Sequence, residues 1–241
     1  MNLTDVYKKY KLEYLELKKI DLNNQIGGDM NNEITRDINN LIEDLKLKGT
    51  SKNNIMACVL KKIMDKLKIT TKQYMIIAGY CLHKYKDVTD LDVVVQKGKK
   101  AYNKLRDSGL CKIDIAKISK DERLILALKN IDENAEIEFF PKARKIGFPS
   151  NYYSLENLQS KKLLDYDDYG NPYFNEITCI NQYSNITRDT DGSYFLEKYQ
   201  VSKERVEKNI SHLKHIALNT PNKKTKKYCK EKIHLLTSLI K

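Results

Sequence analysis

Between residues 73 and 140 the chain carries a series of short β-rich runs, and these runs constrain the fold more than any other feature. Each run is only five to seven residues long and ends near glycine, proline or charged residues. Runs of this length are typical of β-strands, and they are far shorter than the roughly 20 apolar residues of a membrane-spanning helix. The expected strands are Gln73–Ala78, Leu91–Val95, Lys112–Ile118, Arg123–Leu128 and Ala135–Phe140.

Apolar residues at helical spacing predict helices on both sides of these strands. Near the C-terminus, Ser202 is expected to cap a helix that buries Val206 and Ile210, and a second helix follows Pro221. A hairpin is expected to turn at residues 170–172. The remaining expected helices are Leu3–Ile20, Glu33–Lys46, Ser51–Lys68, Gly98–Ser108 and Ser154–Lys162.

These elements predict an α/β (α+β) fold in which a small mixed sheet is flanked by N- and C-terminal helices. We expect three regions along the chain. Residues 1–28 form an N-terminal helix or leader, and residues 29–150 form the core with its preceding helices. Residues 151–241 form a hairpin and a basic helical region.

The cysteines and the N-terminus bear on the cellular compartment. Five cysteines are scattered along the chain without a CxxC pair, so reduced thiols are expected in place of a disulfide framework or a zinc site. The first twenty residues contain lysines every few positions and no apolar signal segment. We therefore expect a soluble intracellular protein with no membrane partner.

The positive charge is concentrated at the C-terminal end. The formal net charge is +12, and the eleven Lys/Arg and three Glu of Val201–Lys241 contribute +8 of it. The densest run of lysines is Lys223–Lys232. Such a run favours weak, salt-sensitive contact with the phosphates of RNA, and its alternative is a solvated helix face.

Four carboxylates carry the chemical signal. Asp90 and Asp92 are two residues apart at the start of a strand, so alternation places both on one face, and the same holds for Glu136 and Glu138. If the two strands are neighbours, one of the glutamates completes a three-carboxylate site suited to Mg²⁺. Upstream, Gly79 lets the backbone approach a phosphate closely, because it has no Cβ.

The segment from Gln73 to Phe140 resembles the polymerase-β-like nucleotidyltransferase superfamily. It has an apolar strand, Gly79 with a short helix, the Asp-x-Asp pair opening a second strand, and a later acidic strand. The amino-acid sequence of residues 78–82 and 89–92 is most similar to the minimal and abortive-infection-type branches of this superfamily. Tyr80 departs from the pattern, because the family prefers glycine or serine after the first glycine.

The resemblance implies a set of residue roles. Asp90 and Asp92 would be catalytic residues that bind two Mg²⁺ ions, and Glu138 (or Glu136) would supply the third carboxylate. Gly79 and the residue after it, Tyr80, would line the triphosphate of a nucleoside triphosphate. The implied reaction transfers a nucleoside monophosphate to a hydroxyl acceptor, either RNA or protein, by a two-metal mechanism.

The N-terminus carries a second resemblance. Tyr7–Lys11, Tyr14–Lys18 and Asn24–Gly28 are similar to the leader found on many proteins of large amoebal DNA viruses. This implies expression in the cytoplasm of an infected host cell, with packaging in the virion as a further option. An exposed amphipathic helix with a Gly-Gly hinge is compatible with the same residues.

Two other readings stay open. Beside an active enzyme, the chain could be a catalytically silent nucleotidyltransferase-like binding or virion protein, which Tyr80 favours. It could also be an unrelated α/β interaction protein in which Asp90 and Asp92 are only strand-entry residues. Asp189–Ser193 resembles the start of a calcium loop but lacks the later glycine and glutamate, so we expect a polar hairpin turn. His212 and His215 have no nearby ligand residues in the sequence and are interpreted as surface histidines.

Overall fold

The computed structural model describes residues 31–82, 84, 87–95, 100–115, 122–141, 163–196 and 199–241. Some predicted elements lie outside these residues: the leader of residues 1–28 and the helix of residues 154–162. Within the described residues, no helix is both long and apolar enough to cross a membrane.

Within the described residues, two helices precede the sheet, at the positions where the sequence predicts Glu33–Lys46 and Ser51–Lys68. The first is described over residues 31–47, and the chain leaves it through Gly49, whose φ is +70°. The second, α2 (Lys52–Lys66), begins at Ser51, whose hydroxyl accepts a hydrogen bond from the backbone of Asn54. Both helices bury isoleucines in the largest core cluster of the described residues, which also contains one face of the sheet.

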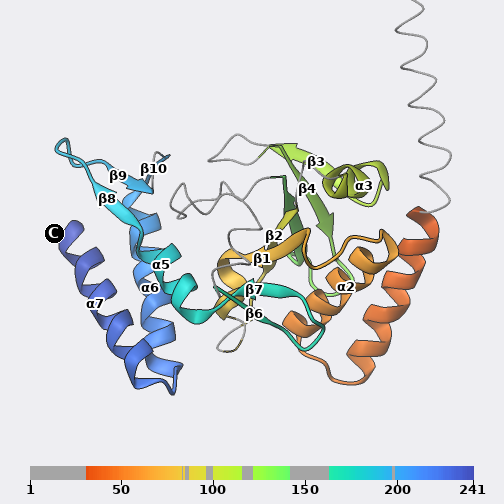
Figure 1. The fold of residues 1–241 in the computed structure, drawn as a ribbon, viewed down its shortest axis with the longest axis horizontal. Helices are drawn as coiled ribbons and strands as arrows, with labels where there is room; N and C mark the ends of the chain where they lie inside the picture. The colour runs from red at the N-terminus through yellow and green to blue at the C-terminus, as the bar shows by residue number, and fades with distance from the viewer. Residues whose placement is uncertain are drawn as a thin grey trace, which may run out of the picture.

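A seven-stranded sheet forms the centre of the molecule, in the order β3-β4-β5-β2-β1-β7-β6 (Figure 1). The β2/β5 and β1/β7 pairs are parallel and the other pairs are antiparallel, so the predicted mixed sheet is confirmed. The strands are β1 (Tyr74–Ile77), β2 (Asp90–Val95), β3 (Lys112–Ile115), β4 (Glu122–Ala127), β5 (Glu136–Phe140), β6 (Leu164–Tyr166) and β7 (Pro172–Phe174).

Two short helices interrupt the strands. The 3-10 helix η1 (Ala78–Leu82) directly follows β1, and α3 (Ala101–Asp107) lies between β2 and β3. The sequence predicts this helix from residue 98, whereas α3 begins at Ala101, after Lys100 in the left-handed region of the backbone (φ +66°). The strands β1 and β2 are antiparallel, so the last residue of β1 lies beside the first residues of β2. Gly79, in η1 directly after β1, therefore lies near the start of β2.

The sheet continues beyond residue 150, where the sequence suggests a regional boundary. The hairpin of β6 and β7 adds to the edge of the sheet through the parallel pairing of β1 with β7. Asn171, in the predicted turn, is fully buried and links three segments. Its amide donates to the carbonyl of Ala57 on α2, and its side-chain oxygen accepts a hydrogen bond from the Tyr74 hydroxyl.

The C-terminal part has its own hydrophobic core. Ser202 and Asn222 cap the two long helices α6 and α7, which lie side by side, with α7 on the outer side of α6 (Figure 1). Residues 189–193 form the turn of a hairpin, as predicted. The elements are α5 (Glu176–Ser184), β8 (Ile186–Arg188), β9 (Tyr194–Leu196), β10 (Tyr199–Val201), α6 (Lys203–Asn219) and α7 (Lys223–Leu239).

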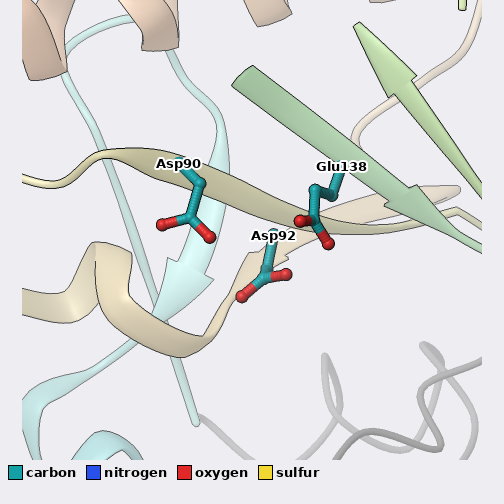
Figure 2. A group of neighbouring side chains, drawn as sticks. All are labelled: Asp90, Asp92 and Glu138. Atoms are coloured by element: carbon teal, nitrogen blue, oxygen red, sulfur yellow. The ribbon is translucent and has the colours of Figure 1, made fainter. Parts of the chain in front are cut away.

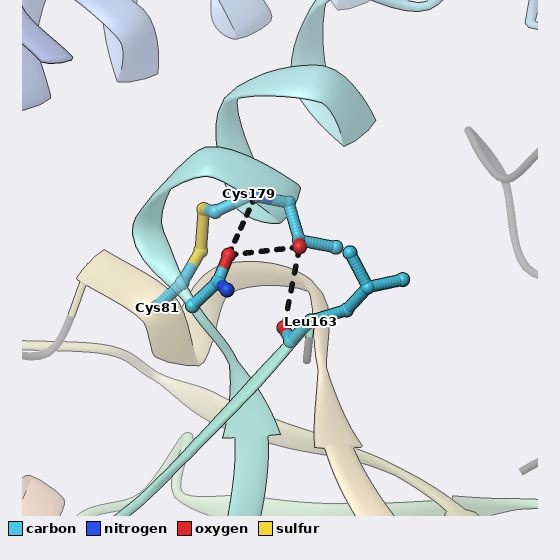
Figure 3. The surroundings of a disulfide bond; sticks show 5 residues. Cys81, Leu163 and Cys179 are labelled. Carbon is cyan, nitrogen blue, oxygen red and sulfur yellow. Dashed lines mark hydrogen bonds between the residues drawn. A yellow bond between two sulfur atoms is a disulfide. The ribbon is translucent and has the colours of Figure 1, made fainter. Parts of the chain in front are cut away.

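The expectation that all the cysteines are reduced is wrong for one pair. Cys81 in η1 and Cys179 in α5 form a disulfide, although they are 98 residues apart in the sequence (Figure 3). Beside it, the hydroxyl of Thr178 lies 3.2 Å from the carbonyl oxygen of Leu163, so α5 is attached both to η1 and to the start of the β6 hairpin. The other three cysteines are free thiols, as expected.

Candidate active site

Three carboxylates meet where β2 and β5 run side by side. The parallel register pairs Asp92 with Glu138 and Asp90 with Glu136, so the predicted adjacency of the two acidic strands is confirmed. One carboxylate oxygen from each of Asp90, Asp92 and Glu138 lies within 4.8 Å of the others (Figure 2). Glu136 is not part of this group, so the structure selects Glu138 as the third carboxylate.

Strand alternation explains why the aspartates face away from the main core. Leu91 and Val93 are fully buried in the cluster that includes α2, and the alternating positions Asp90 and Asp92 project from the opposite face of β2. The carboxylates are therefore held by the backbone register of two paired strands. Sequence alternation alone is sufficient to predict the common face of Asp90 and Asp92, whereas the pairing of β2 with β5 brings Glu138 to it.

An arginine on the neighbouring strand holds Glu138. Glu138 is only 6% exposed, and its Oε1 accepts a hydrogen bond of 2.6 Å from the guanidinium of Arg123 on β4. The same guanidinium binds Asp114 on β3 at 2.7 Å and thereby lowers the pKa of that carboxyl. Arg123 thus restricts the orientation of Glu138, and sequence reasoning overlooked it because the contact depends on the pairing of β4 with β5.

The group of Asp90, Asp92 and Glu138 could hold a metal ion. Three negative charges within 4.8 Å repel one another by about 1 to 4 kcal/mol per pair at effective dielectric constants of 80 to 20. Arg123 offsets part of this charge, but it is shared with Asp114. Oxygen-only ligands and a surplus of negative charge are the preferences of Mg²⁺, so the residues fit the predicted ion.

A pocket of about 220 Å³ opens beside the aspartates. One wall, which we call the sheet wall, contains Gly79, Asp90 and Asp92. The facing wall, which we call the helical wall, consists of residues from α5 and α6 and includes Gln182, Tyr183, Arg205, Lys208, Asn209 and His212. A negatively charged edge of the sheet therefore faces a polar and cationic helix surface.

Gly79 lines the pocket, as the sequence predicts for a ligand-binding glycine, whereas Tyr80 does not line it. A Cβ on Gly79 would lie 3.9 Å from the Tyr183 hydroxyl, an ordinary contact, so packing within the protein does not require the glycine. Tyr80 is 1% exposed, its hydroxyl donates to Asp167, and its ring packs edge-on against Tyr173. The side chain of Tyr80 is therefore buried in the core and is not part of the pocket lining.

Sequence analysis missed the helical wall. Arg205, Lys208, Asn209 and His212 recur at helical spacing and form one side of α6. The interpretation of His212 as a surface residue needs correction, because it is half-buried, lines the pocket and lies 4.8 Å from the Tyr183 ring, centroid to centroid. The polar stripe of the helix was the available signal, and it was overlooked because only the apolar face was followed.

Tyr183 connects the two walls. Burial raises the pKa of its hydroxyl, the charges of Asp92 and Asp90 raise it further, and Arg205 opposes them. The hydroxyl thus stays protonated at neutral pH and remains a hydrogen-bond donor beside Gly79.

Within the described residues, the carboxylate group is the only cluster of three or more His, Cys, Asp or Glu side chains with metal-binding spacing.

Comparisons with protein-family models, with curated proteins and with solved structures find no match to this chain. A functional conclusion therefore depends on the chemistry of the pocket and of the carboxylates.

Proposed function

We propose that the protein is a magnesium-dependent nucleotidyltransferase that moves a nucleoside monophosphate from a nucleoside triphosphate to a hydroxyl group. One observation carries the proposal. Asp90, Asp92 and Glu138 converge beside a pocket whose opposite wall contributes Arg205 and Lys208. Carboxylates for a divalent cation that face cations for phosphate are the two requirements of metal-assisted phosphoryl chemistry.

The carboxylates and the helical wall have different roles in the proposed reaction. Asp90 and Asp92 would bind the ions, and Glu138, held by Arg123, would orient the ion nearest the attacking oxygen. When bound, two Mg²⁺ ions supply activation of the acceptor hydroxyl and neutralisation of the leaving pyrophosphate. On the other wall, Arg205 and Lys208 stabilise the negative charge of the phosphates through charge-assisted hydrogen bonds.

The acceptor is proposed to be a hydroxyl group of RNA or of a protein. A pocket of about 220 Å³ lies below the usual range of about 300–1,000 Å³ for ligand sites, which leaves a polymeric acceptor outside it. The lysines at residues 223–232 belong to α7, which lies on the side of α6 away from the large sheet (Figure 1). RNA held there would have to pass around α6 to reach the aspartates.

Asp92→Asn tests the proposal. The variant keeps the shape of the side chain and removes the charge, so we expect loss of transfer from labelled ATP, GTP, CTP and UTP to total RNA or protein. In thermal unfolding, a nucleotide at a hundred times its Kd with Mg²⁺ should stabilise the native protein by about 2.7 kcal/mol. Asp189→Asn, at an exposed hairpin turn, is the matched control and should behave as the native protein.

The outcomes separate the remaining readings. Nucleotide stabilisation without any transfer would identify a catalytically silent binding protein. Full transfer by Asp92→Asn at saturating Mg²⁺ would refute the metal mechanism. A native protein that responds to none of the four nucleotides would refute the whole proposal.

A further inference from the structure

Three polar atoms of the helical wall have no hydrogen-bond partner. They are Oε1 of Gln182, Oδ1 of Asn209 and Nε of Arg205, and among the described residues they are the buried side-chain atoms left unsatisfied. All three residues line the pocket. A buried polar group without a partner costs about 1–3 kcal/mol, so three in one wall indicate a site whose partner comes from a ligand.

The orientation of Asn209 is defined by a neighbour. Its Nδ2 donates a hydrogen bond of 2.9 Å to the backbone carbonyl of Tyr183. A carbonyl can only accept, so the amide nitrogen must occupy that position and the oxygen must be the atom left over. Asn209 is 1% exposed and Gln182 is 7% exposed, so bulk water does not satisfy either amide.

The three unsatisfied atoms define which hydrogen-bonding groups a ligand must offer. Two amide oxygens require hydrogen-bond donors, and the Nε–H of Arg205 requires an acceptor or an anion. Arg205 and Asn209 are four residues apart on α6, which puts their Cβ atoms about 5–6 Å apart. The ligand must therefore carry donors within a short distance of an anionic group.

We infer that Gln182 and Asn209 bind the ribose hydroxyls of the nucleotide while Arg205 binds its phosphate. This rests on the nucleotidyltransferase function proposed above. In a nucleotide the ribose hydroxyls are close to the phosphate, whereas an exocyclic amine of the base is on the far side of the sugar. The amides thus select ribonucleotides over deoxyribonucleotides, and they act as specificity residues distinct from the metal-binding carboxylates.

Calorimetric titration of the native protein with Mg²⁺ and a set of four nucleotides tests the inference. ATP is compared with 2′-deoxy-ATP and 3′-deoxy-ATP, which each lack one sugar donor, and with ITP, which lacks the base amine. We expect both deoxy analogues to bind about tenfold to a hundredfold more weakly than ATP, because the loss of either hydroxyl leaves a buried amide oxygen unpaired. ITP should bind within about threefold of ATP on the same reasoning.

Gln182→Met gives an independent readout. Methionine is similar in length and has no strong hydrogen-bonding atom, so the unliganded variant should melt at the native temperature or above it, since an unsatisfied buried atom is removed. The same variant should lose part of the discrimination against the deoxy analogues. Gln200→Met, at an exposed position of β10, is the matched control and should keep the native discrimination.

Each result bears on one of the two proposals. Equal binding of ATP and both deoxy analogues, or a preference that depends only on the base amine, would overturn the ribose assignment and leave the proposed function intact. A marked loss of stability in unliganded Gln182→Met would show a structural role and also overturn the assignment. Absence of any nucleotide binding by the native protein would overturn the proposed function and, with it, the assignment.

Discussion

The sheet wall and the helical wall of the pocket are built in different ways. The carboxylates Asp90, Asp92 and Glu138 come from paired strands, so backbone hydrogen bonds between β2 and β5 set their positions. The helical wall comes from a later part of the chain, between Gln182 and His212. Its position depends on the packing of α5 against η1 and of α6 against α5.

The two walls also belong to different hydrophobic cores. One wall belongs to the large sheet, whose buried residues share a core with α2. The other belongs to the C-terminal core, which reaches the sheet wall at η1 through Cys81 and Leu82. The disulfide between Cys81 and Cys179 is a covalent link between the two walls. Changes in the sheet wall should act on chemistry, and changes in the helical wall should act on binding.

The largest effect is expected from the two glutamates of β5. Glu138→Gln removes a carboxylate of the metal group and should reduce transfer by on the order of a hundredfold or more. Glu136→Gln makes the same chemical change two residues away, outside that group, and should keep transfer close to the native rate. Rate measurements on purified variants at saturating Mg²⁺ check both.

Equal losses in the two glutamate variants would contradict the choice of Glu138. Such a result would indicate that β5 acts through its total negative charge. Both variants should fold, because glutamine keeps the size of glutamate and its amide oxygen can still accept the hydrogen bond that Arg123 donates at position 138.

The next effect comes from the covalent link between the walls. Replacing both Cys81 and Cys179 with serine opens a link between residues 98 positions apart, and it should lower the free energy of unfolding by about 2–4 kcal/mol. Nucleotide affinity should fall with it, because α5 carries Gln182 and Tyr183. Denaturant unfolding and calorimetric titration measure the two effects.

Cys58→Ser is the control for the disulfide, because Cys58 is a half-buried free thiol. It should change neither the nucleotide affinity nor, by more than about 1 kcal/mol, the stability. Native stability that is the same with and without a thiol reductant would show that the link makes no contribution.

The smallest effect is expected from one lysine of the helical wall. Lys208→Met should weaken nucleotide binding by about tenfold, and the difference should shrink at high salt, because the interaction is with charged phosphates. Lys214→Met makes the same change on an exposed part of α6 that does not line the pocket, and it should leave binding unchanged. Titrations at two salt concentrations distinguish them.

A salt-independent loss in Lys208→Met, or an equal loss in Lys214→Met, would contradict the phosphate contact. The first result would indicate that the aliphatic part of the side chain is what matters. The second would indicate that the charge of the whole helix acts at a distance.

Much of the local structure could be predicted from the sequence, because strand alternation and helix caps depend on neighbouring residues. Ser51 and Ser202 cap helices as expected, and β2 and β5 begin within a residue of the predicted positions. The common face of Asp90 and Asp92 follows from the two-residue period of a strand. The helix α5 was not predicted, although Asn175 at its start is an ordinary N-cap.

The choice of partners between distant segments could be made only in three dimensions. Periodicity places Glu136 and Glu138 on one face, but the register against β2 and the ion pair with Arg123 select Glu138. The same applies to the pairing of Cys81 with Cys179 and to the side of α6 that faces the aspartates. Each depends on contacts between residues far apart in the chain, and a local pattern contains no information on which of several compatible surfaces will meet.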